Sequence, residues 1–268
     1  MSREGQSYVP SANPTHLVEA RDVVKVFESK TRRTLAVDRI SFNIREGEFV
    51  SLLGPSGCGK STMLKLIAGL EPATSGTIAV EGRPVSRPVT NLGIVFQDPV
   101  LLEWRDVIDN VMIQIDVRGL DRARYLDHAK ALLAQVSLTD FVRSYPFELS
   151  GGMRQRVSIV RSLVHNPPLL LMDEPFSALD ALTRDSMNVL LHDLWRTHHK
   201  TVLFITHSLA DAVFLSQRVM VMSPRPGRIV AELPIDLPAE RTLALRESPD
   251  FTRHTGRLRE IFEGLGVL

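Results

Sequence analysis

The stretch Gly54-Pro55-Ser56-Gly57-Cys58-Gly59-Lys60-Ser61-Thr62 fits the pattern G-x-x-x-x-G-K-[ST]. An apolar run at residues 49–53 precedes it, and residues 61–70 follow with apolar side chains at helical spacing. A strand, a glycine-rich turn and a helix in this order bring backbone N–H groups and the positive end of the helix to one point. The stretch therefore predicts a cradle for the phosphates of a nucleotide, with Lys60 at the terminal phosphates and the Ser61 hydroxyl on Mg²⁺.

A second loop of small residues lies downstream, Leu149-Ser150-Gly151-Gly152-Met153-Arg154-Gln155-Arg156. A helix is expected to begin near Gly152, because residues 157–164 carry an apolar stripe and Asn166-Pro167-Pro168 ends it. The Ser150 hydroxyl and the free N–H groups at the start of this helix form a second anion site. Since the chain has one phosphate cradle, this second site has no nucleotide of its own.

Two carboxylates, Asp173 and Glu174, end an apolar run at residues 169–173. Ligands of open α/β sheets bind at the carboxyl ends of strands, so this pair is expected beside the phosphate cradle. Asp173 is then placed to hold Mg²⁺ through water, and Glu174 to polarise a water that attacks the terminal phosphate.

Apolar runs of strand length recur as in a parallel sheet that is covered on both faces. They lie at residues 49–53, 92–96, 169–173, 202–206 and 219–222. Three further stretches, at residues 17–27, 40–44 and 78–80, favour antiparallel strands. Between residues 98 and 149 the spacing becomes helical, with an apolar side formed by Ala123, Leu126, Leu133 and Val136. The fold class is therefore α/β with a helical insert, and residues 234–268 end in an amphipathic helix.

Composition excludes several other classes of protein. Lys and Arg total 32 and Asp and Glu total 31, so the net charge of +1 argues against a dedicated nucleic-acid binder. Cys58 is the one cysteine, which rules out an intrachain disulfide, and we interpret it as a small filler. No apolar run approaches the roughly 20 residues that span a bilayer, so any link to a membrane runs through a partner. Residues 1–14 lack a signal-peptide pattern and are expected to be a mobile lead-in.

Taken together, these residues resemble the ATP-binding subunits of ABC transporters over residues 17–227. The markers of that family follow in its order: Gly54 to Thr62 (Walker A), Gln97 (Q-loop), Leu149 to Arg156 (signature), Leu169 to Glu174 (Walker B), Ser177-Ala178-Leu179-Asp180 (D-loop) and His207 (switch histidine). The resemblance implies an α/β fold with a P-loop NTPase (RecA-like) core, an antiparallel β subdomain and an inserted α-helical subdomain. It places the ATPase domain at residues 15–250, the insert at about 98–155 and a carboxyl-terminal appendix at 251–268.

The family also implies roles for single residues and for a second copy of the chain. Two subunits pack head to tail, and each signature loop caps the γ-phosphate of the ATP bound by the other subunit. Gln97 then touches Mg²⁺ or the attacking water, His207 contacts the γ-phosphate, and Asp180 organises the dimer interface. Phe27 fits the aromatic residue that stacks on adenine, although a core phenylalanine is the alternative.

Two segments are similar to those of importers of nitrate, sulfonates and taurine: Asp98-Pro99-Val100-Leu101-Leu102-Glu103-Trp104-Arg105 and Ser223-Pro224-Arg225-Pro226-Gly227-Arg228-Ile229. This resemblance implies transmembrane permease subunits as partners, a periplasmic or extracellular solute-binding protein as an indirect partner, and a peripheral place on the cytoplasmic face of the cell membrane. Trp104 is expected near the groove that receives the permease, with an ordinary surface tryptophan as the alternative. Two other readings stay open: an ABC ATPase of lipoprotein extraction or cell division, and an ABC ATPase without a transport role.

Overall fold

A six-stranded sheet forms the centre of the protein, in the order β10-β9-β3-β8-β7-β6. The structure is a computed structural model that describes residues 16–29 and 31–267, so the lead-in expected over residues 1–14 lies outside the described residues. The five strands β9, β3, β8, β7 and β6 are parallel to one another, and β10 pairs antiparallel with β9. Their bounds are β3 Phe49–Leu53, β6 Leu92–Val95, β7 Leu169–Asp173, β8 Thr201–Thr206, β9 Arg218–Met222 and β10 Ile229–Pro234.

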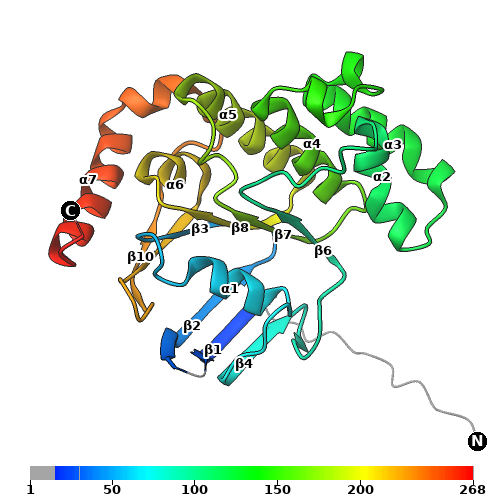
Figure 1. Cartoon of the computed structure of the whole chain (residues 1–268). Helices are drawn as coiled ribbons and strands as arrows, with labels where there is room; N and C mark the ends of the chain where they lie inside the picture. Colours follow the sequence, from blue (N-terminus) through cyan, green and yellow to red (C-terminus); the bar gives the residue numbers. More distant parts are fainter. Residues whose placement is uncertain (1–15, 30, 268) are drawn as a thin grey trace, which may run out of the picture.

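Both faces of this sheet are covered, which explains the continuous apolar runs. In β3, Phe49 and Leu53 join one hydrophobic core while Val50 and Leu52 join another on the opposite face. Figure 1 shows α1 (Lys60–Ile67) and a second sheet on one side, and the helices α4, α5 and α6 on the other. The parallel strands expected from the sequence are thus confirmed, each to within one residue at either end.

The second sheet is antiparallel and has the order β2-β1-β4-β5. It consists of β1 His16–Glu28, β2 Arg33–Arg45, β4 Ser75–Val80 and the short β5 Arg83–Pro84. All three expected antiparallel strands are present in it, and β1 and β2 are longer than the apolar pattern indicated. Their alternation of buried and exposed residues is typical of a sheet with one face on the core.

Within the described residues, six further α-helices lie between or after the strands of the sheet, and each begins at a side chain that caps it. Their bounds are α2 Val107–Val117, α3 Arg122–Gln135, α4 Gly151–Leu163, α5 Ala181–His198, α6 Leu209–Leu215 and α7 Pro249–Gly264. The capping residues are Asp106, Asp121, Ser150, Asp180, Ser208 and Ser248, respectively. Each accepts a hydrogen bond from a backbone N–H of the first turn, which fixes where the helix starts.

The apolar side predicted for the helical insert is partly wrong. α3 buries Ala129, Leu132 and Leu133, whereas Ala123 is exposed. The helix begins at Arg122, capped by Asp121, so Ala123 lies in the first turn. The stripe predicted for α4 is confirmed, since Val157, Val160 and Val164 are all fully buried.

Candidate active site

The glycine-rich stretch between β3 and α1 forms a tight loop around the start of the helix. Gly57 and Gly59 have φ angles of +75° and +112°, which side-chain-bearing residues rarely adopt. A Cβ at Gly59 would also lie 2.9 Å from the Ala36 carbonyl oxygen of β2. The loop therefore needs glycine at this position for two independent reasons.

Lys60 is the first residue of α1, and its side chain folds back over this loop. Its Nζ donates hydrogen bonds to the carbonyl oxygens of Gly54 at 2.9 Å and Pro55 at 3.0 Å. The same Nζ lies 3.3 Å from Oε1 of Glu174. With only 4% of its surface exposed, this ammonium group is held at the centre of the site.

The end of β7 brings the expected acidic pair to the loop. The Ser61 hydroxyl donates a hydrogen bond of 2.9 Å to Oδ1 of Asp173. Burial raises the pKa of the Asp173 carboxyl, and the Ser61 hydrogen bond opposes that rise. Oε2 of Glu174 lies 2.8 Å from Nδ1 of His207, which follows β8. Glu174 adopts a left-handed φ of +45°, a backbone conformation that is rare for a residue with a side chain.

A cavity of about 380 Å³ opens over these groups. The described residues that line it are Phe27, Thr34, Ala36, Ser56, Gly57, Gly59, Lys60, Ser61, Thr62, Gln97, Asp173, Glu174 and Arg225. Phe27 is 40% exposed, and Lys25 Nζ lies 4.8 Å from the centroid of its ring, so the alternative of a core phenylalanine is wrong. Gly54, Pro55 and Cys58 lie outside the lining; Cys58 is buried, and burial raises the pKa of its thiol.

Three residues of the lining, Thr34, Ala36 and Arg225, belong to none of the predicted site motifs. Thr34 and Ala36 belong to β2 of the antiparallel sheet, and Arg225 to the loop between β9 and β10. Arg225 lies within the segment that carried the importer resemblance, but no local pattern links that segment to the phosphate loop. A backbone bridge between Val37 and Gly227 creates the link in three dimensions.

The signature residues lie away from this cavity within one chain. Ser150 caps α4 by accepting a hydrogen bond of 3.3 Å from the Met153 N–H, and Ser150 and Gly151 are exposed. Asp180 caps α5 in the same way through the Thr183 N–H at 3.0 Å, and hydrogen bonds from the Thr183 side chain and backbone lower the pKa of the Asp180 carboxyl. A Cβ at Gly152 would lie 2.7 Å from Cγ2 of Thr183, so the starts of α4 and α5 are in close contact.

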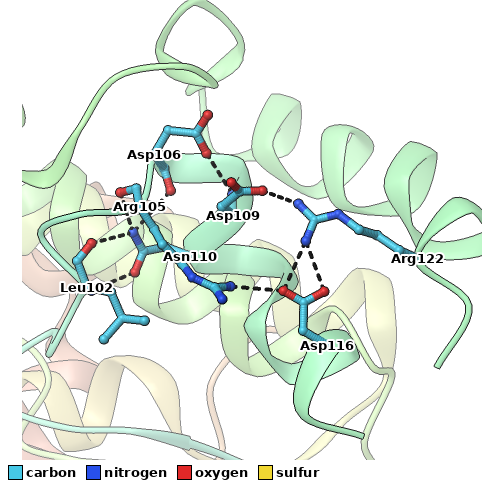
Figure 2. A network of polar contacts seen from close by, with 7 residues as sticks. All are labelled: Leu102, Arg105, Asp106, Asp109, Asn110, Asp116 and Arg122. Carbon is cyan, nitrogen blue, oxygen red and sulfur yellow. Dashed lines mark hydrogen bonds and ion pairs between the residues drawn. The ribbon is translucent and has the colours of Figure 1, made fainter. Parts of the chain in front are cut away.

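The segment after Gln97 is held by side chains of α4 and α2. Arg161 of α4 donates hydrogen bonds to the carbonyl oxygens of Val100 at 2.8 Å and Pro99 at 2.6 Å. Asn110 of α2 is fully buried and binds both the N–H and the carbonyl of Leu102, as Figure 2 shows. The turn that follows presents Trp104, which is 75% exposed.

Figure 2 also shows the ion pairs between this turn and the helices beside it. Arg105 donates to Asp116 at 2.9 Å, and Arg122 of α3 donates to both carboxylate oxygens of Asp116. Arg122 contacts Asp109 as well. These contacts connect the turn to α2 and α3.

The residues around Ser61 suit a hard cation that also binds phosphate. The Ser61 hydroxyl, the Asp173 carboxylate and the Gln97 amide place three oxygen ligands for a metal ion in the cavity. Among the described residues no group of three or more His, Cys, Asp or Glu side chains could hold a metal alone. Mg²⁺ typically binds one or two protein oxygens and takes its other ligands from substrate phosphates and water. The donor set therefore fits Mg²⁺.

No helix within residues 16–29 and 31–267 has both the length and the apolar character needed to cross a bilayer.

Comparison with known proteins gives one consistent family. The model of the ABC transporter family matches residues 37–177. The taurine import ATP-binding protein TauB of Rhizobium johnstonii is 47% identical, over 88% of this chain and 92% of its own length. The nitrate import ATP-binding protein NrtD of a Synechocystis species is 43% identical, over 92% and 95%.

Solved structures agree with the sequence relatives. The dimeric structure of MJ0796, a bacterial ABC transporter cassette, superposes with a TM-score of 0.73 at 30% identity, over 82% of this chain and 99% of that chain. A post-hydrolysis dimer of the same cassette, bound to ADP and Pi, gives a TM-score of 0.71. The cradle, the acidic pair and these relatives lead to one conclusion: the chain belongs to the ABC transporter family and is an ATP-binding, ATP-hydrolysing subunit of it.

Proposed function

We propose that this chain energises an importer of a small anion, of the aliphatic sulfonate, taurine or nitrate class. The observation that carries the proposal is its likeness to the taurine and nitrate import subunits at 43–47% identity over nearly the full length of both chains. The chain then works on the cytoplasmic face of the membrane, bound to transmembrane permease subunits, and a periplasmic or extracellular solute-binding protein delivers the anion.

We also propose roles for the residues of the cavity. Lys60 binds the β- and γ-phosphates, Phe27 stacks on adenine, and the backbone N–H groups from Gly57 to Thr62 cradle the phosphates. Glu174 orients the attacking water and accepts its proton. This role is supported by the position of its carboxylate beside the cavity, with Oε1 near Lys60 Nζ and Oε2 near His207 Nδ1. His207 then contacts the γ-phosphate.

The Mg²⁺ ion belongs to the same proposal. Ser61, Asp173 and Gln97 are the oxygen donors that would hold it. When bound, Mg²⁺ neutralises charge on the β- and γ-phosphates. Burial raises the pKa of the Asp173 carboxyl, and a nearby cation favours its ionised form.

Two copies of the chain complete the reaction in this proposal. Ser150, Gly151 and Gly152 cap the γ-phosphate held by the partner, and Asp180 lies in the interface. The support is that Ser150, Gly151 and Asp180 are exposed and none of them lines the cavity of its own chain. The solved MJ0796 cassette is itself dimeric.

The expected domain limits also stay a proposal. Residues 15–250 form the ATPase domain, about 98–155 its helical insert, and 251–268 an appendix. The helices α2 and α3 occupy that insert, and Phe251, Leu258 and Phe262 of α7 pack on the main core beside α6.

Uptake measurements in cells test the transport proposal. A strain without this chain is compared with the same strain carrying the wild type or Lys60→Ala, using labelled taurine, an alkanesulfonate and nitrate. We expect uptake of one of these anions to need the wild type, and Lys60→Ala to fail although it is expressed. Normal uptake of all three without the chain would refute the substrate class.

A further inference from the structure

Arg225 lines the cavity from the loop between β9 and β10, outside the six family markers from Walker A to the switch histidine. Its Nη2 donates a hydrogen bond of 3.0 Å to the carbonyl oxygen of Gly57 in the phosphate loop. The residue also lines the 380 Å³ cavity together with Lys60 and Ser61. The guanidinium group therefore lies at the phosphate half of the cavity, on the loop itself.

The loop that carries Arg225 is fixed against the cavity wall. Gly227 donates to the Ala36 carbonyl at 3.0 Å and accepts from the Asp38 N–H at 2.9 Å, which ties the loop to β2. A Cβ at Gly227 would lie 2.2 Å from the Cys58 carbonyl oxygen, so the loop also touches the phosphate loop closely. The backbone that carries Arg225 is therefore held beside the phosphate loop by its contacts with β2 and with Cys58.

The charge of Arg225 is not neutralised by the protein. Among the described residues no carboxylate pairs with it, and its one hydrogen bond uses one of the five N–H groups of a guanidinium. Arg228, three residues further on, differs: it donates to Oδ2 of Asp38 at 2.8 Å and lowers the pKa of that carboxyl. The same loop therefore holds one paired arginine and one that faces the cavity.

Of the two cations in the described lining of the cavity, Arg225 has the more donors left for a ligand. The charged residues of that lining are Lys60 and Arg225 against Asp173 and Glu174. Lys60 already contacts two carbonyl oxygens and Glu174, whereas Arg225 is exposed and has four N–H groups free to point at a ligand. A guanidinium fork suits phosphate oxygens better than any other ligand group of ATP.

We propose that Arg225 is a nucleotide-binding residue that donates hydrogen bonds to the phosphates beyond the α-phosphate, from within the same chain. The inference rests on the proposed assignment of this cavity to ATP and is independent of what the transporter carries.

Calorimetric titration with ADP tests the inference, because ADP has a β-phosphate and is not hydrolysed. We expect Arg225→Gln to weaken ADP binding about three- to tenfold, as for the loss of an exposed charge-assisted hydrogen bond. AMP, measured by competition against ADP, should change less than about twofold. Arg228→Gln is the matched control, since it removes the same charge from the same loop, and it should also change ADP binding less than about twofold.

Each other outcome overturns the inference. Unchanged ADP affinity in Arg225→Gln would show that the guanidinium does not touch the nucleotide, even if ATP turnover slows. An equal loss for AMP and ADP would place the contact at the base, ribose or α-phosphate. Lys60→Ala separates this failure from a failure of the cavity assignment: if Lys60→Ala leaves ADP binding intact, the cavity itself is misassigned.

Discussion

Replacing Asn110 with alanine removes the side chain that organises the Trp104 turn. Its Oδ1 accepts from the Leu102 N–H at 2.7 Å. Its Nδ2 donates to the carbonyl oxygens of Leu102 at 3.0 Å, Arg105 at 2.8 Å and Asp106 at 3.0 Å. Two hydrogens of the amide thus serve three acceptors, and the residue has no exposed surface.

The loss of stability on this replacement can be worked out from the number of hydrogen bonds that are removed. One hydrogen comes from Leu102 and two from the amide, and a buried hydrogen bond contributes about 1 kcal/mol net. We therefore expect Asn110→Ala to lower the free energy of unfolding by about 3 kcal/mol. Asn110→Asp keeps the volume but turns a carboxylate toward three carbonyl oxygens, so it should cost more than alanine.

Urea denaturation followed by circular dichroism measures this loss. With a slope of about 3 kcal/mol per molar urea, the midpoint of Asn110→Ala should fall by roughly 1 M. Asn91→Ala is the control, because Asn91 is an exposed asparagine that donates to Glu81 at 3.3 Å; its midpoint should stay within about 0.2 M of the wild type. A loss below about 0.5 kcal/mol for Asn110→Ala would refute the reasoning, since it would mean that the buried contacts stabilise nothing.

Three further predictions concern catalysis, the dimer and pH. Glu174→Gln should keep ATP binding, lower turnover by about 100-fold or more and accumulate an ATP-bound dimer in gel filtration, whereas near-normal turnover would exclude Glu174 as the base. Ser150→Arg should block hydrolysis without changing ATP affinity of the monomer, and a parallel loss of affinity would contradict a role across the dimer. Burial, with help from Arg241 and Arg196, lowers the pKa of His192 from 6.5 to about 4. As the pH is lowered, His192 is therefore protonated in the unfolded state at a higher pH than in the folded state. The free energy of unfolding should fall by up to about 3 kcal/mol as the pH decreases from 6.5 to 4. His192→Phe should flatten this decline in urea titrations at each pH, and equal slopes would refute the assignment.

Strands buried on both faces could be predicted from the sequence, and β10 could not. β3 and β7 have continuous apolar runs because each face of the sheet meets its own core. β10 lacks a continuous buried apolar run, because its residues are alternately half-buried and exposed and it ends in Pro234. Its pairing with β9 depends on the edge that β9 offers, which is a tertiary contact.

The same distinction holds for the site. Lys60, Asp173 and Glu174 could be predicted because the chemistry lies in short motifs at strand ends. Arg225 and Ala36 reach the cavity through the bridge between Val37 and Gly227, which are 190 positions apart in a chain of 268. A contact between such distant residues cannot be predicted from the spacing of residues along the chain.

The close fit of Gly152 against Thr183 limits how these positions can change together. A methyl group at 152 would lie 2.7 Å from Cγ2 of Thr183, so a larger residue at 152 requires either a shift of the Thr183 side chain or a smaller residue at 183. The two positions should therefore covary among natural variants of this chain. The contact joins the first turns of α4 and α5, the helices that Ser150 and Asp180 cap.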